Sequence, residues 1–475
     1  MVWLTELIRN SIIVLFTFSW LYSLMGSSIS FWMAWLIIPL IMEIIPAMGN
    51  FVILINRKRR RSHQEKDWHL GYEPEISLII PVYNSEKTLY RCLESVYRSD
   101  YPAKKIHIIL SNNESTDRSF QIFTESQNKF PEMVMTWVDA KQGKSKALNL
   151  ALFNSNSKYI IHIDSDGILH KDALRNMIIL FENDLEIDSV TGTVVVDPVE
   201  IEATERFGKR LLRKLEFFEY CQAFLAGRNF QAEFNAIYTM SGAFSAFRKS
   251  AILRTQLFNT DTVSEDTHLT FQLRETLGSK ITICNEAIFF VEPIEGVNEL
   301  YAQRQRWQMG EMEVIHIFMR NRLNAVRGML GSFILRILIY DHTFAFPRMI
   351  WYFALICLLF LNYPLRLIVL SFVLIFLLYV FAGFLYYLNI LIFLKPLPEL
   401  RKYYSSKWYL VILLPAFNFM VFWFRFAGIL NSINGQKVWK TLDLTAERKA
   451  AKAVLMKDFA WFLRLKSKGD SLINH

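Results

Sequence analysis

The stretch YIIHIDSDG, residues 159–167, runs from an apolar, β-branched segment into two aspartates. Segment 159–163 predicts a buried strand, and Asp164 and Asp166 follow where that strand ends. Because alternate residues of an extended chain share a face, both carboxylates are expected to reach one spot. Oxygen ligands of this kind suit Mg²⁺ or Mn²⁺, often together with the phosphates of a substrate. The alternative is purely structural, because Asp tolerates turns and Gly167 favours one.

Strand-like and helix-like segments alternate on both sides of this stretch, over residues 73–319. We predict strands at 76–81, 106–110, 133–138, 159–163 and 189–196, and helices at 85–97 and 145–153. Such an alternation predicts one α/β domain with a mostly parallel sheet, and about 250 residues can bury a single core. Ligands of these sheets bind beyond the carboxyl ends of the strands, where Asp164 and Asp166 lie.

Apolar segments flank this domain in a chain of 475 residues that is 52% hydrophobic, with a mean hydropathy of +0.21. Their length and low charge predict membrane crossings at 8–25, 31–55, 344–361, 365–394 and 408–430. A secretory signal is the alternative for the first segment, but no convincing cleavage site precedes the second. Segment 365–394 is long for one crossing, so we expect a tilted helix or two short helices that meet near Gly383.

Charge sets the expected orientation. The run RKRRR, residues 57–61, adjoins a predicted crossing, which marks the cytoplasmic side and predicts contact with anionic lipid. The basic tail is expected in the cytosol too, which requires an even number of crossings after residue 320. We therefore expect segment 365–394 to cross twice, or a stretch near 333–340 to contribute. The predicted parts are a transmembrane hairpin with the basic run (1–61), a cytosolic α/β domain (73–319), interfacial and transmembrane helices (320–430) and a basic cytosolic tail (431–475).

Composition excludes some classes of protein. The net charge of +9 fits a membrane surface better than a nucleic-acid partner, because the middle of the chain has no basic stripe with interleaved aromatic residues. A disulfide framework or a zinc site is not expected either, because no C-x-x-C spacing occurs among the four cysteines, Cys92, Cys221, Cys284 and Cys357.

Three further motifs carry chemistry. KQGKSKALN places lysines around Gly143 ahead of a helix, where they can hold a diphosphate, although a basic loop is often plain surface. TVSEDTHLT places Glu265 and Asp266 at a helix start, as caps or with one as a general base. QRQRW puts three side chains on one helix face, where Arg can pair with phosphate and Trp can stack on a sugar: Gln303, Arg306 and Trp307.

The ordered set PVYN, SNNESTD, GKSKALN, IDSDG, SGAFSAFR, SEDTHLT and QRQRW resembles the membrane-embedded processive glycosyltransferases of family 2, over residues 76–310. These include the synthases of cellulose, hyaluronan and poly-N-acetylglucosamine. The chain also resembles a smaller bacterial group associated with exosortase-type systems. The resemblance implies an α/β GT-A (nucleotide-diphospho-sugar transferase) domain inserted between transmembrane helices, with a UDP-sugar and Mg²⁺ or Mn²⁺.

The resemblance also implies roles by position. The residues expected to bind the nucleotide-sugar are Tyr83, Glu86, Asn113, Lys144, Asp164 and Arg306. Asp166 would bind the metal and Asp266 would be the catalytic base. The acceptor would meet Ser241, Gly242, Ala243, Glu265, Gln303 and Trp307. The chain departs from the family at two places: Asn112 and Asn113 stand where an acidic residue usually contacts the base, and Ser85 replaces a common Glu.

The implied activity is inverting transfer of sugars to a polysaccharide, processive and with export through the membrane helices. The expected partners are a UDP-sugar donor, a growing glycan or lipid-linked acceptor, anionic lipid and an accessory membrane subunit, without nucleic acid. The expected location is the bacterial cell membrane, multi-pass, with the catalytic domain in the cytoplasm. The alternatives are single addition to a polyprenyl-phosphate lipid and an inactive membrane scaffold.

Overall fold

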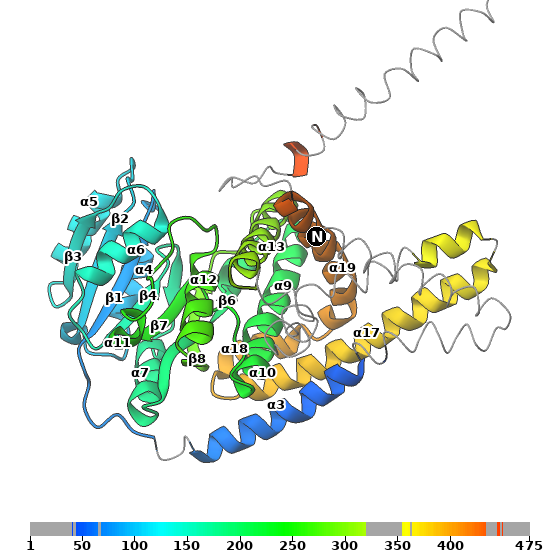
Figure 1. The fold of residues 1–475 in the computed structure, drawn as a ribbon, viewed down its shortest axis with the longest axis horizontal. Helices are drawn as coiled ribbons and strands as arrows, with labels where there is room; N and C mark the ends of the chain where they lie inside the picture. Colours follow the sequence, from blue (N-terminus) through cyan, green and yellow to red (C-terminus); the bar gives the residue numbers. More distant parts are fainter. Residues whose placement is uncertain are drawn as a thin grey trace, which may run out of the picture.

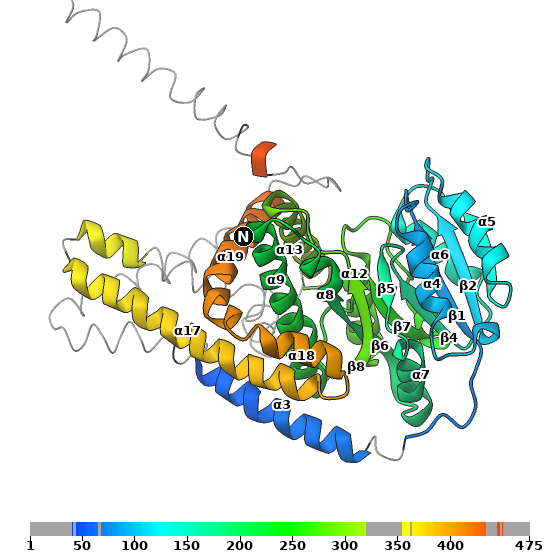
Figure 2. The same cartoon turned by 180° about the vertical axis from the view of Figure 1, so that it is seen from behind.

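The computed structural model describes residues 44–64, 68–319, 354–361 and 363–433, together with 40, 444–446 and 449. The predicted crossing at 8–25, the stretch near 333–340 and most of the tail lie outside the described residues. Figure 1 shows a sheet domain at one end of the molecule and the helices α3 (Ile45–Gln64) and α17 (Leu365–Phe393) at the other. Figure 2 shows from behind that these two helices run side by side, and they are in contact.

The sheet has eight strands in the order β3-β2-β1-β4-β7-β6-β8-β5. Their bounds are β1 Ile76–Val82, β2 Ile106–Asn112, β3 Val134–Asp139, β4 Tyr159–Ile163, β5 Gly167–Leu169, β6 Ile187–Val196, β7 Phe244–Arg248 and β8 Lys280–Val291. The five predicted strands are present, and their ends move by at most two residues. β1, β2, β3 and β4 pair in parallel, as do β6 and β8, but β7 runs antiparallel to both its neighbours and β5 antiparallel to β8. The sheet is therefore mixed, where a mostly parallel one was expected.

Helices cover both faces of the parallel half, which explains why all seven residues of β1 are buried. Leu78 and Ile80 belong to one apolar cluster with Leu89 of α4, whereas Ile79 belongs to another with Leu148 of α6. Alternate residues thus enter opposite layers, as the strand period requires. The helices of this domain are α4 Leu89–Tyr97, α5 Ser119–Lys129, α6 Lys144–Phe153, α7 Ala173–Asn183, α8 Pro198–Glu202, α11 Lys249–Ile252 and α12 Glu265–Phe271. The predicted helix 85–97 begins four residues late, at Leu89.

A helical layer joins the sheet domain to α3 and α17. It contains α9 Phe207–Tyr220, the π-helical segment η4 Cys221–Gly227, α10 Arg228–Glu233, α13 Val297–Met319, α18 Pro398–Ser406 and α19 Leu410–Ile433. α13 packs closely on α19 at Gly428, where a Cβ atom would lie 2.7 Å from the carbonyl oxygen of Gln305. Only a residue without a side chain fits at this crossing.

Two described helices are long and apolar enough to cross a bilayer, Leu365–Phe393 and Leu410–Asn431. Both follow the sheet domain in the chain. α17 is one continuous helix of 29 residues, about 43 Å long at 1.5 Å per residue, which exceeds a hydrocarbon core of about 30 Å. The expectation that segment 365–394 crosses twice, as two short helices, is therefore wrong, because the backbone hydrogen bonds continue through Gly383 without a break.

The basic run at the end of α3 contacts α10 and the sheet domain. Arg57, which is 7% exposed, donates through Nε to Oδ1 of Asn229 at 3.2 Å and through Nη1 to Oε2 of Glu233 at 3.0 Å. Arg60 pairs with the other oxygen of Glu233. Both partners belong to α10, so this helix is held against α3 by charge.

The neighbouring basic residues extend the contact to β8. Arg61 donates to the carbonyl oxygen of Ile283 at 3.1 Å, and Nζ of Lys58 lies 3.8 Å from Oε1 of Glu286. Arg59 is exposed. Four of the five basic side chains thus reach the protein, and contact of the run with anionic lipid remains a prediction.

Candidate active site

A cavity of about 1170 Å³ opens where the carboxyl end of β4 faces the helical layer. Most of the predicted site residues line it: Lys144, Asp164, Asp166, Ser241, Gly242, Ala243, Glu265, Asp266, Gln303, Arg306 and Trp307. They come from segments between residues 144 and 307, so the fold brings distant motifs together. Tyr83, Glu86 and Asn113 do not line the cavity.

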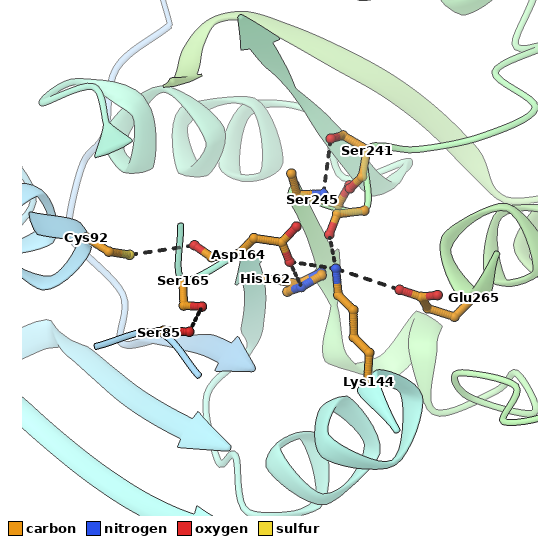
Figure 3. A network of polar contacts seen from close by, with 11 residues as sticks. Ser85, Cys92, Lys144, His162, Asp164, Ser165, Ser241, Ser245 and Glu265 are labelled. Carbon is orange, nitrogen blue, oxygen red and sulfur yellow. Dashed lines mark hydrogen bonds and ion pairs between the residues drawn. The ribbon is translucent and has the colours of Figure 1, made fainter. Parts of the chain in front are cut away.

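Asp164 directly follows β4 and is paired with Lys144 (Figure 3). Nζ of Lys144 donates to Oδ1 of Asp164 at 2.6 Å, and His162 Nε2 lies 3.5 Å from the same oxygen. Burial raises the pKa of Asp164, but the charges and hydrogen bonds of Lys144 and His162 together outweigh burial and hold that pKa below its ordinary value. Asp164 is therefore ionised, and its charge is already balanced within the protein.

Lys144 is the first residue of α6 and turns into the cavity. Gly143 precedes it with φ of 131°, in the region that favours glycine, which lets the loop reverse before the helix begins. Nζ of Lys144 also donates to the carbonyl oxygen of Gly242 at 3.1 Å and lies 3.8 Å from Oε1 of Glu265. Burial lowers the pKa of Lys144, but the carboxylates of Asp164 and Glu265 outweigh it and raise that pKa. The cavity therefore contains a fixed positive charge.

Asp166 has a different environment from Asp164. Burial, and then the charge of Asp164, raise the pKa of Asp166 to about 6. Among the described residues, no basic side chain forms an ion pair with it. No group of three or more His, Cys, Asp or Glu side chains that could hold a metal occurs in this part of the chain either. Within the described part of the chain, Asp166 is thus a carboxylate without an ion-pair partner.

Asp266 lies in the first turn of α12 and approaches Gly242. A Cβ atom on Gly242 would lie 2.7 Å from Oδ2 of Asp266, so this glycine makes room for the carboxylate. Oδ1 of Asp266 accepts a hydrogen bond from the backbone N–H of Thr267 at 2.7 Å. One oxygen therefore holds the side chain in place, while Oδ2 lies at the wall of the cavity beside Gly242.

Glu265 precedes Asp266 and is more deeply buried, at 8% exposure. Burial raises the pKa of Glu265 above its ordinary value, even though the charge of Lys144 acts in the opposite direction. Figure 3 shows Glu265 and Asp164 on opposite sides of the Lys144 ammonium group. Glu265 therefore helps to fix the lysine.

The motif QRQRW forms part of α13. Gln303, Arg306 and Trp307 are half-buried and line the cavity on one side of the helix, as their spacing predicts. Sequence reasoning missed Arg304, which is completely buried and pairs with Glu219 of α9. A signal was present, because Arg304 shares a helix face with Leu300 and Tyr301, which are both apolar.

The residues expected at the base of the nucleotide lie on the loops after β1 and β2. Tyr83 is 53% exposed, and Oε2 of Glu86 accepts from Nε of Arg118 at 3.3 Å. Oδ1 of Asn113 accepts from the backbone N–H of Gly143 at 2.5 Å. The loop after β2 is therefore tied to the lysine-bearing loop, while the roles predicted for these side chains stay predictions.

The two departures from the family pattern have local partners. Nδ2 of Asn112 donates to Oδ1 of Asp139 at the end of the neighbouring strand, at 2.9 Å. The hydroxyl groups of Ser85 and Ser165 lie 2.8 Å apart, so Ser85 contacts the residue between the two aspartates (Figure 3). The four cysteines are free, as expected.

Comparison with known proteins agrees with this geometry. Residues 77–254 match the model of the family described as Glycosyl transferase family 2. The chain is 26% identical over 278 residues to a poly-β-1,6-N-acetyl-D-glucosamine synthase of Staphylococcus aureus (strain COL), covering 58% of this chain and 64% of the relative. A synthase of the same name from Staphylococcus epidermidis is 27% identical over 279 residues, with the same coverage. The chain thus spans just under two thirds of the length of these curated relatives.

A solved structure supports the fold over a larger part of the chain. A mannosyltransferase from Pyrobaculum calidifontis, in complex with GDP-Man and Mn²⁺, superposes with a TM-score of 0.55 at 18% identity, over 83% of this chain and 99% of that one. The α/β domain is therefore GT-A-like, with a mixed sheet and with two apolar helices after it in the chain. Together these findings show that residues 77–254 match family 2 glycosyltransferases and that the chain is similar to the poly-β-1,6-N-acetyl-D-glucosamine synthases.

Proposed function

We propose that the protein is an inverting, metal-dependent glycosyltransferase that uses a UDP-sugar to extend a glycan at the cytoplasmic face of a membrane. The proposal rests on one observation, which is that residues expected at the donor and residues expected at the acceptor line the same cavity. Lys144 and Asp166 lie at the donor end, and Gln303, Arg306 and Trp307 line the wall that α13 supplies. Asp266 lines the same cavity.

At the donor end, the ammonium group of Lys144 would face the diphosphate. It is fixed by hydrogen bonds to Asp164 and to the carbonyl of Gly242. A cation held in place before the reaction stabilises charge that develops on a leaving group without reorganisation. Arg306 would contribute a second positive charge from the α13 wall.

The residues present fit a hard divalent cation. Asp166 offers carboxylate oxygens, and its raised pKa reflects a charge that burial and Asp164 disfavour and that a cation would compensate. Mg²⁺ commonly takes one or two carboxylates and completes its coordination with water and substrate phosphates, so the absence of a larger described cluster is no obstacle. When bound, Mg²⁺ or Mn²⁺ would neutralise charge on the departing diphosphate.

At the acceptor end, Asp266 would act as the general base. The acceptor hydroxyl attacks the anomeric carbon as the bond to the diphosphate breaks, and its proton passes to the carboxylate of Asp266. Attack from the side opposite the diphosphate inverts the configuration at that carbon. The rigid position of Asp266, between Thr267 and Gly242, favours this role.

The reach of the cavity favours extension of a chain over a single addition. Beyond the catalytic residues it continues between the helices α3, α17 and α19, where its wall includes Asn50, Tyr379, Tyr386, Asn418 and Phe419. Aromatic rings with a few polar groups suit the faces and edges of sugars. A growing glycan would leave the active site along this path. The curated relatives are named as synthases of a polymer of N-acetylglucosamine, so UDP-N-acetylglucosamine is the first donor to test.

The test uses the purified full chain in nanodiscs with Mn²⁺ and a panel of UDP-sugars. Release of UDP is measured together with the size of the product. We expect one donor to be used and a ladder of products to appear. One added sugar on a polyprenyl phosphate would indicate the single-addition enzyme instead. Absence of turnover and of UDP binding, with every donor, would point to an inactive scaffold.

A further inference from the structure

Arg304 is a buried cation in the wall of the acceptor site. Its side chain has no exposed surface, although Arg304 belongs to QRQRW and its neighbours Gln303, Arg306 and Trp307 line the cavity. Nε of Arg304 donates to Oε1 of Glu219 at 3.2 Å, and Nη2 donates to Oε2 at 2.6 Å. This two-bonded pair fixes the plane of the guanidinium group.

The remaining contacts of Arg304 are made with the predicted acceptor residues. Nη1 donates to Oε1 of Gln303, and the guanidinium carbon lies 4.3 Å from the centre of the Trp307 ring. The centre of the Tyr220 ring lies 5.5 Å from the same carbon. One side chain thus holds an amide and an indole that both line the cavity.

The chemistry of arginine settles the orientation of the Gln303 amide. A guanidinium group only donates hydrogen bonds, so the atom of Gln303 that meets it must be the carbonyl oxygen. The NH₂ group of the same amide then points away from Arg304. Since Gln303 lines the cavity, a donor rather than an acceptor is available to a bound sugar.

We propose that Arg304 is a positioning residue that, through its pair with Glu219, makes Gln303 present its NH₂ group and Trp307 its ring to the acceptor. The inference rests on the proposed function, because it assumes that an acceptor glycan occupies this wall. Arg304 itself does not touch the reacting atoms. Its effect is on acceptor binding, whereas the donor end around Lys144 is independent of it.

Two variants test this inference. Arg304→Lys keeps the charge but cannot span Glu219, Gln303 and Trp307 at once. Gln303→Glu keeps an oxygen toward Arg304, with an added negative charge, and replaces the NH₂ donor that faces the cavity by an oxygen acceptor. Arg98→Lys is the matched control, because Arg98, which directly follows α4, also pairs with a glutamate, Glu94, at 2.7 Å, but its side chain is 73% exposed.

The readout is binding, which needs no turnover. A short β-1,6-linked N-acetylglucosamine oligosaccharide is titrated into the full chain in nanodiscs by calorimetry, and UDP with Mn²⁺ is titrated into the same samples. We expect both variants to bind the oligosaccharide about tenfold more weakly, the loss typical of one polar contact, with UDP affinity unchanged. In turnover assays the acceptor KM should rise while the donor KM stays constant.

Other results would overturn the inference. Unchanged oligosaccharide affinity in Gln303→Glu would mean that the amide presents its oxygen, and equal losses of UDP and oligosaccharide binding in Arg304→Lys would mean that Arg304 only supports the fold. A wild-type chain that binds no oligosaccharide would also contradict it. The proposed function fails separately, when the wild type binds both ligands but turns over no UDP-sugar.

Discussion

A Cβ atom placed on Gly242 would lie 2.7 Å from Oδ2 of Asp266, closer than side-chain atoms normally approach. Gly242 needs no unusual backbone angle, so its lack of a side chain serves this approach alone. The carbonyl of Gly242 also accepts from Nζ of Lys144 at 3.1 Å. Gly242 therefore lies against both Lys144, the cation at the proposed donor site, and Asp266, the proposed base.

Gly242→Ala should displace Asp266 and slow transfer. Because an error of about 1 Å in a reacting group can cost up to about a hundredfold, we expect a loss of about tenfold to a hundredfold in kcat. UDP binding should stay within a few-fold. Gly71→Ala is the control, because nothing lies within 4 Å of a Cβ there. Wild-type kcat in Gly242→Ala would show that Asp266 can move without consequence.

Asp266→Asn separates chemistry from binding. The amide keeps the shape and the hydrogen bond from Thr267 but cannot accept the proton of the acceptor hydroxyl, so transfer should fall by at least about a hundredfold. Equilibrium binding of UDP and metal should change little. If Asp266 were only a helix cap, the change would cost little, because Asn caps about as well as Asp. Near-normal turnover would move the base to Glu265.

Removal of the cation tests the role of Asp166. EDTA should abolish turnover, and Mn²⁺ or Mg²⁺ should restore it, because the leaving diphosphate would otherwise depart with its charge uncompensated. Asp166→Asn should weaken metal-dependent UDP binding, whereas Asp266→Asn should not. Full activity in chelator would contradict the assignment of a metal to Asp166.

The strands that sequence reasoning found are those whose signal is local. β4 is a β-branched run that ends at Asp164, and β1 is buried on both faces, so each reads as a strand by itself. β8 was missed because Cys284, Asn285 and Glu286 interrupt its apolar pattern. β7 has only five residues and pairs antiparallel with strands far away in the chain, which no local pattern specifies.

The site was predictable for a similar reason. Lys144, Asp164 and Asp266 each follow or begin a recognisable element, and the carboxyl ends of parallel strands meet at one edge. The helix face that Arg304 shares with Leu300 and Tyr301 indicates its burial, but its partner Glu219 lies 85 residues away in the sequence and is not predictable from that pattern. The position of α3 was not predictable from local sequence either, because the partners of its basic run lie on α10 and β8, far away in the chain.

Glu216 gives the stability of the protein a pH dependence. It is 1% exposed, and burial raises its pKa from 4.5 to about 7, while its Oε2 accepts from the backbone N–H of Ile294 at 3.2 Å. Below pH 4.5, Glu216 is protonated in both the folded and the unfolded protein. Between pH 4.5 and about 7, Glu216 is ionised in the unfolded chain but keeps its proton in the folded protein. The free energy of unfolding therefore falls as pH rises through this window and levels off above it.

Glu216→Gln should abolish this decrease in the free energy of unfolding with rising pH. The amide still accepts the hydrogen bond from Ile294 but does not titrate, so the variant should exceed the wild type in stability at about pH 8, by on the order of 3 kcal/mol, and match it at about pH 4. Thermal unfolding in detergent at both pH values measures this. Glu186→Gln, at a side chain 81% exposed, controls for loss of a surface charge. A constant difference between Glu216→Gln and the wild type at both values would rule out titration as the cause.

The basic run at the end of α3 provides the last prediction, because two roles for it have different consequences. If it holds α3 to the catalytic domain, Arg57→Ala should lower the free energy of unfolding by about 1–3 kcal/mol in neutral detergent, since Glu233 loses a partner and buried Asn229 loses a donor. Arg59→Ala, at the exposed position of the same run, should change it little. If the run acts mainly on anionic lipid, both variants should be equally stable in neutral detergent and should differ from the wild type only in vesicles that contain anionic lipid. We expect the first result, because the guanidinium group of Arg57 is 7% exposed and already satisfied by protein groups.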